Sequence, residues 1–283
     1  MAHEQPEVLL ALLQLLDDAR NDIFLHIDRK AKDVEAALLG YAPKRAGFHR
    51  IQPAQKVYWG DLSQVMAEYL CFEEARKVGK YAYYHLISGV DMPIVAMDAF
   101  HAFFEKHQGR EFVSFWMDEG HRHDLHKKVS RHYLFTRFLK KNHDLLLHRI
   151  TTPIRKSVLA VEKALHYERR HRVAFHKGFN WCSVTDEFCA YLLSEKQNLL
   201  RLFRRTLCPD EIYKQTCVWH SPFRDRLFDT EDPERGCMRR VDWKRGSPYV
   251  WQAEDLDELL ASGFLFARKF SLEAAQALLA RSR

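Results

Sequence analysis

Residues 23–30 read Ile-Phe-Leu-His-Ile-Asp-Arg-Lys, a largely apolar run that ends in three charged side chains. A short apolar run closed by polar residues is typical of a buried parallel strand that presents polar groups at its carboxyl end. Amphipathic stretches flank it, at residues 7–19 before the run and at 32–39 after it. The sequence here therefore predicts a strand between two helices.

The same alternation continues along the chain. Further strands are predicted at 48–51, 81–87 and 111–116, and further helices at 62–77, 97–106 and 185–202. Strands that alternate with helices indicate an α/β fold with a mostly parallel central sheet flanked by helices. We find no internal repeat, low-complexity tract or linker, so we expect a single domain over residues 1–283.

The positive charge of the chain is regional. The 283 residues are 47% hydrophobic and 29% charged, with a formal net charge of +6. Residues 121–172 hold 14 Lys and Arg against 4 Asp and Glu, a net +10, so the rest of the chain carries −4. Eight of the 16 histidines lie in the same segment. Helical patterns at 134–150 and 155–170 make 121–172 a predicted basic helical insertion.

Several classes of protein are disfavoured by absent patterns. No apolar stretch is long enough for a membrane span, and the start lacks the pattern of a secretory signal. The six cysteines show no C-x-x-C spacing, so we expect a cytoplasmic protein without disulfides or structural zinc. There is no P-loop, GxGxxG, HExxH or GxSxG motif.

Two patterns could suggest a metal, and neither favours one. Asp255 and Asp257 form the only D-x-D, but it lies in an amphipathic stretch rather than on a loop after a strand. His121, His123 and His126 lie among lysines and arginines, which disfavour a second cation. We therefore expect no metal site.

Adjacent carboxylates at Asp210 and Glu211 follow Cys208-Pro209 at a loop-to-helix junction. One can cap the helix or hold a cation while the other takes part in proton transfer. The alternative is an acidic first turn that only complements the helix dipole.

Two pairs of cations are candidate anion-binding groups. Arg268 and Lys269 lie in the aromatic frame of residues 264–270, which can orient the charged groups toward diphosphate oxygens. Lys244 and Arg245 lie on a predicted turn. The alternative reading of the first pair is a solvated surface pair near the C-terminus.

Several stretches, taken together and in order, resemble the Core-2/I-branching family of glycosyltransferases. That family includes branching β-1,6-N-acetylglucosaminyltransferases and protein xylosyltransferases, and this chain resembles a bacterial-type member. The matching stretches are Ala2-His3, residues 24–30, Trp59-Gly60, and residues 84–93, 177–181, 209–211, 241–243 and 266–270.

The resemblance implies a GT-A-like fold, a UDP-sugar donor and inversion at the anomeric carbon, without a divalent metal or other cofactor. The expected donor is UDP-GlcNAc, with UDP-xylose as the alternative. The expected acceptor is a glycan hydroxyl, on a lipid-linked glycan of bacterial surface polysaccharide synthesis.

Carried over by position, Glu211 matches the family's catalytic base, and Lys269, beside Arg268, matches its diphosphate-binding lysine. Asp28 matches the aspartate that contacts uracil. Either Trp59 or Tyr58 matches the aromatic residue that packs on the base.

The remaining assignments concern the edges of the site. Lys244 or Arg245 is expected to replace the family's second diphosphate-binding cation, and His3 to line the nucleotide end. The floor of the site is expected from Asp91, Ser88 and Trp181, and acceptor contacts from Lys128 and Arg131.

Members of the family usually have an apolar strand before the Ala-His pair, which here follows Met1 directly. We expect upstream codons to raise soluble yield and melting temperature.

The +10 segment predicts peripheral contact with an anionic membrane. It also leaves a rival function for the chain, that of a non-catalytic module that binds polyanions or membranes. No nucleic-acid-binding motif accompanies the charge, so we expect no nucleic-acid partner.

Overall fold

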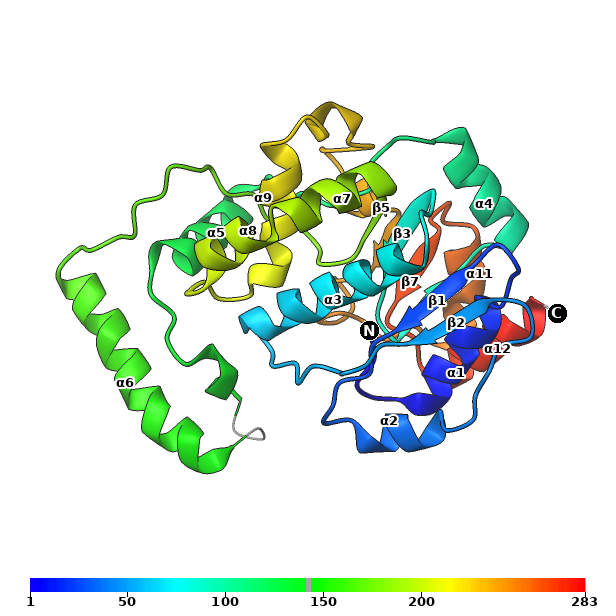
Figure 1. Cartoon of the computed structure of the whole chain (residues 1–283), viewed down its shortest axis with the longest axis horizontal. Coiled ribbons are helices and arrows are strands. Elements are labelled where there is room, and N and C mark those ends of the chain that lie inside the picture. The colour runs from blue at the N-terminus through cyan, green and yellow to red at the C-terminus, as the bar shows by residue number, and fades with distance from the viewer. Residues whose placement is uncertain (141–143, 283) are drawn as a thin grey trace.

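The computed structural model describes residues 1–140 and 144–282 (Figure 1). Short strands occupy the centre of the main body, and helices lie on both sides of them. The predicted α/β class is confirmed.

The first part of the chain contains α1 (Pro6–Leu15), β1 (Asp22–Leu25), α2 (Lys32–Ala37), β2 (Gly47–Arg50), α3 (Leu62–Val78), β3 (Tyr83–Leu86), β4 (Asp91–Pro93) and α4 (Met97–Lys106). The middle contains α5 (Glu119–Ser130), the 3-10 turn η1 (Thr136–Phe138) and α6 (Leu145–Ala164). The last part contains β5 (Cys182–Thr185), α7 (Asp186–Ser194), α8 (Lys196–Phe203), η2 (Pro209–Glu211), α9 (Tyr213–Trp219), η3 (Arg224–Arg226), α10 (Pro233–Cys237), β6 (Arg239–Val241), η4 (Ala253–Asp255), α11 (Leu256–Leu260), β7 (Phe266–Arg268) and α12 (Leu272–Arg281).

The strands pair in both directions. β1 pairs with β2 in parallel, with Asp22 opposite Gly47, and β6 pairs with β7 in parallel, with Arg239 opposite Phe266. The pairs β3–β5 and β4–β7 are antiparallel. The parallel arrangement expected from the sequence thus occurs in two strand pairs, and antiparallel partners extend it.

The basic segment differs most from its expected secondary structure. Two helices were predicted there, at 134–150 and 155–170, whereas the structure has the short turn η1 and one helix, α6. Pro153 lies inside α6, where it removes one backbone hydrogen bond without ending the helix. Residues 141–143 of the predicted insertion lie outside the described part of the chain.

Two hydrophobic clusters hold the main body together. In the first, α1 packs against α12 and against β4 and β7, with Leu9, Met92 and Ala275 all buried. In the second, α3 packs against β3, β5 and α7, with Tyr69 and Val184 buried. These clusters fix the strands whose carboxyl ends carry the polar residues considered below.

Residues Met1 and Ala2 join the ends of β1 and β3. The Ala2 N–H donates to the His26 carbonyl oxygen at 2.9 Å, and the Ala2 carbonyl accepts from the Asp28 N–H at 2.9 Å. On the other side, the Met1 amine donates to the Ile87 carbonyl and the Gly89 N–H donates to the Met1 carbonyl, both at 2.9 Å. The loops that follow the two strands are therefore held next to each other.

Glu111 is a fully buried carboxyl group at the start of α7. It accepts a hydrogen bond from the Thr185 N–H at 3.0 Å and another from the Thr185 hydroxyl. Burial raises its pKa from 4.5 to about 7, although the two hydrogen bonds oppose the shift. In the unfolded chain the group has no such burial, so folding is coupled to its protonation.

We expect Glu111→Gln to flatten the dependence of stability on pH. A folded-state pKa above the unfolded one means that the wild type loses stability as pH rises from 4.5 through about 7. The loss is about 3 kcal/mol at full deprotonation. Urea unfolding of both proteins from about pH 5 to pH 8 measures it, and parallel curves would contradict the assignment.

Candidate active site at the carboxyl ends of the strands

The floor of the site unites four of the predicted residues. The carboxylate of Asp91, at the start of β4, accepts from the Ser88 N–H at 2.8 Å and from its hydroxyl at 2.7 Å. Arg268, at the end of β7, forms an ion pair with Asp91 at 3.3 Å, and its guanidinium lies 4.7 Å from the centre of the Trp181 ring. Arg268 is thereby fixed against the protein.

Lys269 follows Arg268 directly and differs from it in its contacts. Its backbone is held, because its carbonyl accepts from the Trp251 N–H at 2.7 Å. Within the described residues its ammonium has no hydrogen-bond or ion-pair partner. Lys269 is therefore a positioned cation whose charge remains available to a ligand.

The structure separates the two candidates for the second cation. The Arg245 guanidinium contacts three carboxylates, those of Asp242, Asp255 at 3.0 Å and Glu258 at 3.1 Å. Lys244, on the same turn after β6, is exposed and has no side-chain partner in the part of the chain described. Since β6 lies beside β7 in parallel, Lys244 and Lys269 lie at the same edge of the sheet.

Both aspartates of the D-x-D are engaged by arginines. Asp255 pairs with Arg245, and Asp257 pairs with Arg281. Within residues 1–140 and 144–282, no three His, Cys, Asp or Glu side chains converge as metal ligands. The predicted absence of a bound metal remains a prediction.

The end of the site that is expected to bind the nucleotide lies in the loop that follows β1. Asp28 is buried, and it accepts from the Lys30 N–H at 2.9 Å and from the Lys30 ammonium at 2.6 Å. The Tyr58 ring contacts both Lys30 and Arg137, whose cationic groups are 4.6 and 4.8 Å from its centre. Trp59 is 52% exposed, so of the two aromatic candidates it offers the more open face.

His3 is exposed beside this end and contacts only Glu4, at 3.6 Å, among the described side chains. It lies one residue beyond Ala2, which pairs with the backbone of Asp28. The structure therefore places His3 near Asp28 along the chain, and its role at the nucleotide end stays a prediction.

Glu211 ends η2 and is held by two lysines. Its Oε2 atom lies 3.0 Å from the Lys128 ammonium and 3.4 Å from that of Lys177. Both lysines also contact Asp124. The Glu211 Oε1 atom has no partner among the described residues, so one oxygen is fixed while the other can accept a proton.

Lys128 was predicted as an acceptor contact, and the structure places it against Glu211. Burial acts to lower the pKa of its ammonium, but the charge of Glu211 and the hydrogen bonds outweigh burial, and the pKa is raised. Arg131 follows at the end of α5, with one guanidinium nitrogen buried and without a hydrogen-bond partner in the described chain.

A buried ion pair supports the turn that carries Glu211. Lys214 and Glu68 are both completely buried, with their charged groups 2.6 Å apart. The Lys214 ammonium also donates to the Asn180 side chain at 2.6 Å and to the Asp210 carbonyl at 3.3 Å. The Tyr213 hydroxyl donates to Glu68 at 2.7 Å. These contacts tie α3 and α9 to the Pro209–Glu211 turn.

The two adjacent carboxyl groups have different surroundings. Asp210 is buried, accepts from Gln64 at 3.0 Å, and has a pKa raised by burial and by the charges of Glu211 and Glu68. Glu211 keeps 29% of its side chain exposed. The sequence suggested that one carboxylate caps a helix or holds a cation while the other takes part in proton transfer. In the structure Asp210 is buried and accepts from Gln64, whereas the more exposed Glu211 is the one that contacts two cations.

A row of aromatic rings, missed at the sequence level, connects the end of β6 with the Glu211 cluster. Trp243 stacks on Phe179 with centres 6.4 Å apart, Phe179 contacts Trp116 at 4.9 Å, and Trp116 stacks on His121 at 4.5 Å. The Lys177 ammonium lies 4.7 Å from the Trp116 ring centre. Such flat apolar surfaces suit the faces of sugar rings.

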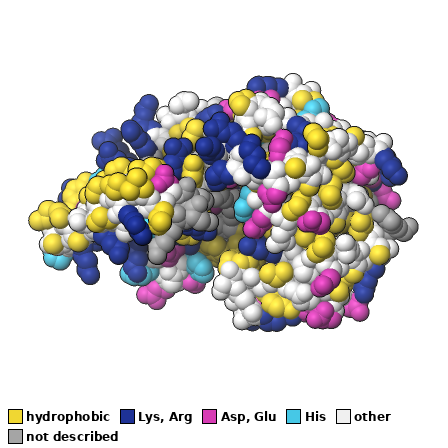
Figure 2. Space-filling model, turned by 90° about the horizontal axis from the view of Figure 1, so that it is seen from below, with side chains coloured by type: hydrophobic (Ala, Val, Ile, Leu, Met, Phe, Trp, Pro, Cys, Tyr) yellow, Lys and Arg dark blue, Asp and Glu magenta, His cyan; other side chains and the backbone are white. Residues whose placement is uncertain are grey.

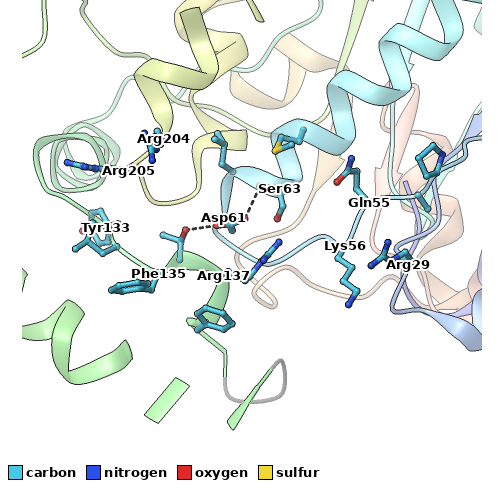
Figure 3. A pocket seen from close by; sticks show the side chains of 17 residues that line it. Arg29, Gln55, Lys56, Asp61, Ser63, Tyr133, Phe135, Arg137, Arg204 and Arg205 are labelled. Carbon is cyan, nitrogen blue, oxygen red and sulfur yellow. Dashed lines mark hydrogen bonds between the residues drawn. The ribbon is translucent and has the colours of Figure 1, made fainter. Parts of the chain in front are cut away.

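A basic cavity of about 1000 Å³ lies between the nucleotide end and the basic segment (Figure 3). The cations that line it come from four separate segments: Arg29, Lys56, Arg137, Arg204 and Arg205. None of them pairs with a carboxylate within the described residues. In Figure 3, Arg137 lies between the Arg204–Arg205 pair and Lys56 with Arg29.

Among the described residues that line this cavity, the one carboxylate is already engaged. Asp61 accepts from the Ser63 N–H at 2.9 Å and from the Thr136 hydroxyl at 2.6 Å. These contacts connect the start of α3 to η1 in the basic segment. The cavity therefore presents a net positive charge to any ligand.

Fold and site together describe an α/β protein with an outward carboxylate and an unpaired lysine near the carboxyl ends of its strands. A comparison with family models identifies the class of protein more closely. The Core-2/I-branching enzyme model matches residues 1–258, and the chain belongs to this family of glycosyltransferases.

Two curated relatives are similar along almost the whole chain. Xylosyltransferase oxt of Drosophila pseudoobscura pseudoobscura is 26% identical over 292 residues, covering 95% of this chain and 30% of that protein. Xylosyltransferase oxt of Drosophila melanogaster is 24% identical over 291 residues, with the same two coverages. The chain thus spans under a third of the length of these relatives.

Among solved structures, mouse xyloside xylosyltransferase 1 in its apo form is similar at a TM-score of 0.39 and 14% identity, covering 94% of this chain and 92% of that one. This likeness is too distant to carry an inference.

We expect Lys214→Met to be strongly destabilising. It leaves the Glu68 carboxylate buried without its cation, a change that costs about 3–5 kcal/mol of unfolding free energy. The matched control is Lys196→Met, whose ion pair with Glu73 is partly exposed and should cost less than about 1 kcal/mol. Urea unfolding measures both.

The double variant Glu68→Gln/Lys214→Met removes both charges and should recover part of the loss. Equal, small effects of the two lysine substitutions would contradict the supporting role of the buried pair.

Proposed function

We propose that the chain transfers a sugar from a UDP-sugar to a hydroxyl group of a glycan, with inversion and without a divalent metal. The observations that carry this proposal are an outward carboxylate, Glu211, held through one oxygen only, and a positioned cation, Lys269, whose ammonium has no partner among the described residues. Inverting transfer requires one proton acceptor and positive charge at the departing diphosphate. Family membership supports the same reaction class.

In this mechanism, the acceptor oxygen attacks the anomeric carbon from the face opposite UDP. A bond forms between that oxygen and the carbon as the bond from the carbon to the diphosphate oxygen breaks. Oε1 of Glu211 takes the hydroxyl proton while Lys128 and Lys177 hold Oε2. UDP departs with its negative charge stabilised by Lys269, and Arg268 remains fixed by Asp91.

The remaining parts of the site supply positioning. Asp28 and the exposed face of Trp59 would hold the uracil, with His3 beside them. Lys244 would act as the second diphosphate-binding cation, because Arg245 is engaged by three carboxylates. The row from Trp243 to Trp116 would support sugar rings on the way to Glu211.

For the donor sugar, the relatives favour the alternative over the first expectation. Both curated relatives are named xylosyltransferases, so we propose UDP-xylose ahead of UDP-GlcNAc. For the acceptor, the basic cavity favours a glycan that carries negative charge, such as one joined to a phosphate-linked lipid. A non-catalytic module that binds polyanions could also use the unpaired cations of the cavity. Sugar transfer by the purified chain distinguishes the two functions.

We expect Glu211→Gln to reduce transfer by at least about 100-fold, because the amide cannot accept the hydroxyl proton. UDP binding should be retained. Asp210→Asn is the matched control: its carboxyl is buried and hydrogen-bonded to Gln64, so the loss should stay below about tenfold. UDP release with acceptor present measures transfer, and the reverse order of effects would assign the base to Asp210.

We expect Lys269→Gln to weaken UDP binding by about 10- to 100-fold, the range for losing a charge-assisted contact. Its melting temperature should not change, because the ammonium has no partner among the described residues. Arg245→Gln is the matched control and should show the opposite pattern, with a lower melting temperature and nearly unchanged UDP affinity. Calorimetry of UDP binding would refute the assignment if Lys269→Gln bound like the wild type.

A further inference from the structure

Helix α6 presents its apolar side chains to solvent. It lies at one end of the molecule, away from the central strands (Figure 1). Six of its large hydrophobic residues, together with the next residue in the chain, are 37–72% exposed: Leu145, Leu146, Leu147, Ile150, Ile154, Val161 and Leu165. Several recur at helical spacing, since residues 146, 150, 154, 161 and 165 fall on one side of a helix. An ordinary surface helix buries this kind of face.

The side of α6 that faces the protein is polar. Thr151, Arg155 and Glu162 are the buried residues of this helix. Glu162 accepts from the His132 N–H at 3.1 Å and also contacts the His132 ring. His148 contacts the Phe138 carbonyl oxygen at 2.8 Å. These contacts fix the rotation of the helix, so the apolar side is held outward.

A line of cations accompanies the apolar side. Arg149, Lys156 and Lys163 are spaced seven residues apart, so they lie along one line of the helix. None has a side-chain partner within the described residues. The two carboxylates of this stretch are engaged, Glu162 with His132 and Asp144 with the Leu147 N–H. The exposed surface of α6 is therefore apolar and cationic (Figure 2).

We propose that α6 binds the surface of a membrane that contains anionic lipids, with its axis in the plane of the membrane. An exposed apolar stripe beside Lys and Arg is the pattern of interfacial helices, which bury the stripe at the headgroup boundary. Anionic headgroups complement Arg149, Lys156 and Lys163. In the described residues, no helix is long and apolar enough to cross a bilayer.

A second copy of this chain is the other candidate for covering the stripe. A second α6 would offer the line of cations no carboxylate, because both carboxylates of this stretch are already engaged, whereas anionic headgroups would neutralise it. The charge pattern therefore favours a lipid surface over self-association.

Membrane binding would also position the basic cavity. Residues just before α6 reach the nucleotide end, where Arg137 lies 4.8 Å from the Tyr58 ring centre and Lys140 lies 5.3 Å from that of Trp59. An α6 on the membrane thus brings the cavity toward the lipid surface. This consequence, unlike the binding itself, rests on the proposed function, because it concerns an acceptor carried on a lipid.

Vesicle co-sedimentation of the full chain tests the proposal. We expect binding to vesicles of phosphatidylcholine with roughly a third phosphatidylglycerol, and weaker binding to phosphatidylcholine alone. Leu146→Ser/Ile150→Ser/Val161→Ser should lose at least about tenfold in partitioning to both kinds of vesicle. Arg149→Gln/Lys156→Gln/Lys163→Gln should lose a similar factor only on the anionic vesicles.

The matched control is Leu39→Ser/Val78→Ser, which removes exposed apolar residues far along the chain from α6 and should bind vesicles like the wild type. No binding of the wild type to anionic vesicles would overturn the proposal.

Sedimentation velocity tests the alternative occupant. If the chain forms a dimer, does not bind vesicles, and loses the dimer in the Leu146→Ser/Ile150→Ser/Val161→Ser variant, the stripe belongs to a second copy instead. Hydrolysis of a soluble UDP-sugar should be unchanged in the α6 variants; if no variant or wild type hydrolyses one while vesicle binding persists, the proposed function fails and this inference stands.

Discussion

The buried ion pair between Lys214 and Glu68 is the interaction on which the candidate site depends most. It joins α3 to α9, and through the Asp210 carbonyl and the Asn180 side chain it holds the two segments that flank Glu211. Two buried charges need compensation, and here the Tyr213 hydroxyl donates to Glu68 and the Lys214 ammonium donates to Asn180 in addition to the ion pair. These contacts use Oε2 of Glu68, while its Oε1 is buried without a hydrogen-bond partner in the described chain. The geometry of the Pro209–Glu211 turn is therefore set from inside the protein rather than by surface contacts.

A second level of charge compensation lies closer to the surface. Lys128, from the basic segment, and Lys177, from the segment before β5, share Asp124 and Glu211. The basic segment therefore contributes to the candidate site through Lys128 as well as forming one wall of the basic cavity through Arg137. Some of its cations lie in the Glu211 cluster, in the cavity and on the outer surface of α6.

Sequence reasoning reached the fold class because that class depends on local pattern. It also proposed residues for the floor of the site that the structure brings together, and their roles stay predictions. The strand at residues 23–27 and the loop from Ser88 to Pro93 were recognisable from apolar runs followed by polar residues, and Asp91, Ser88, Arg268 and Trp181 do meet. Glu68 and Asp124 could not be found in this way, because each is one charged residue on a helix whose partner lies far along the chain. The sequence likewise does not show that Arg245 is paired with carboxylates while Lys244 is not. That difference depends on Asp255 and Glu258, which only folding brings to the turn. The helix prediction failed in the basic segment: it placed a break between residues 150 and 155, whereas α6 continues through this stretch, Pro153 included.

The central claim is that this site breaks the bond between UDP and a sugar by using only its own side chains. The most direct test is the rate of UDP release from UDP-xylose and from UDP-GlcNAc by the purified chain, with EDTA present throughout. The account predicts measurable release that EDTA does not change, faster with UDP-xylose than with UDP-GlcNAc. Release that requires an added divalent metal, or none from either donor, would contradict it.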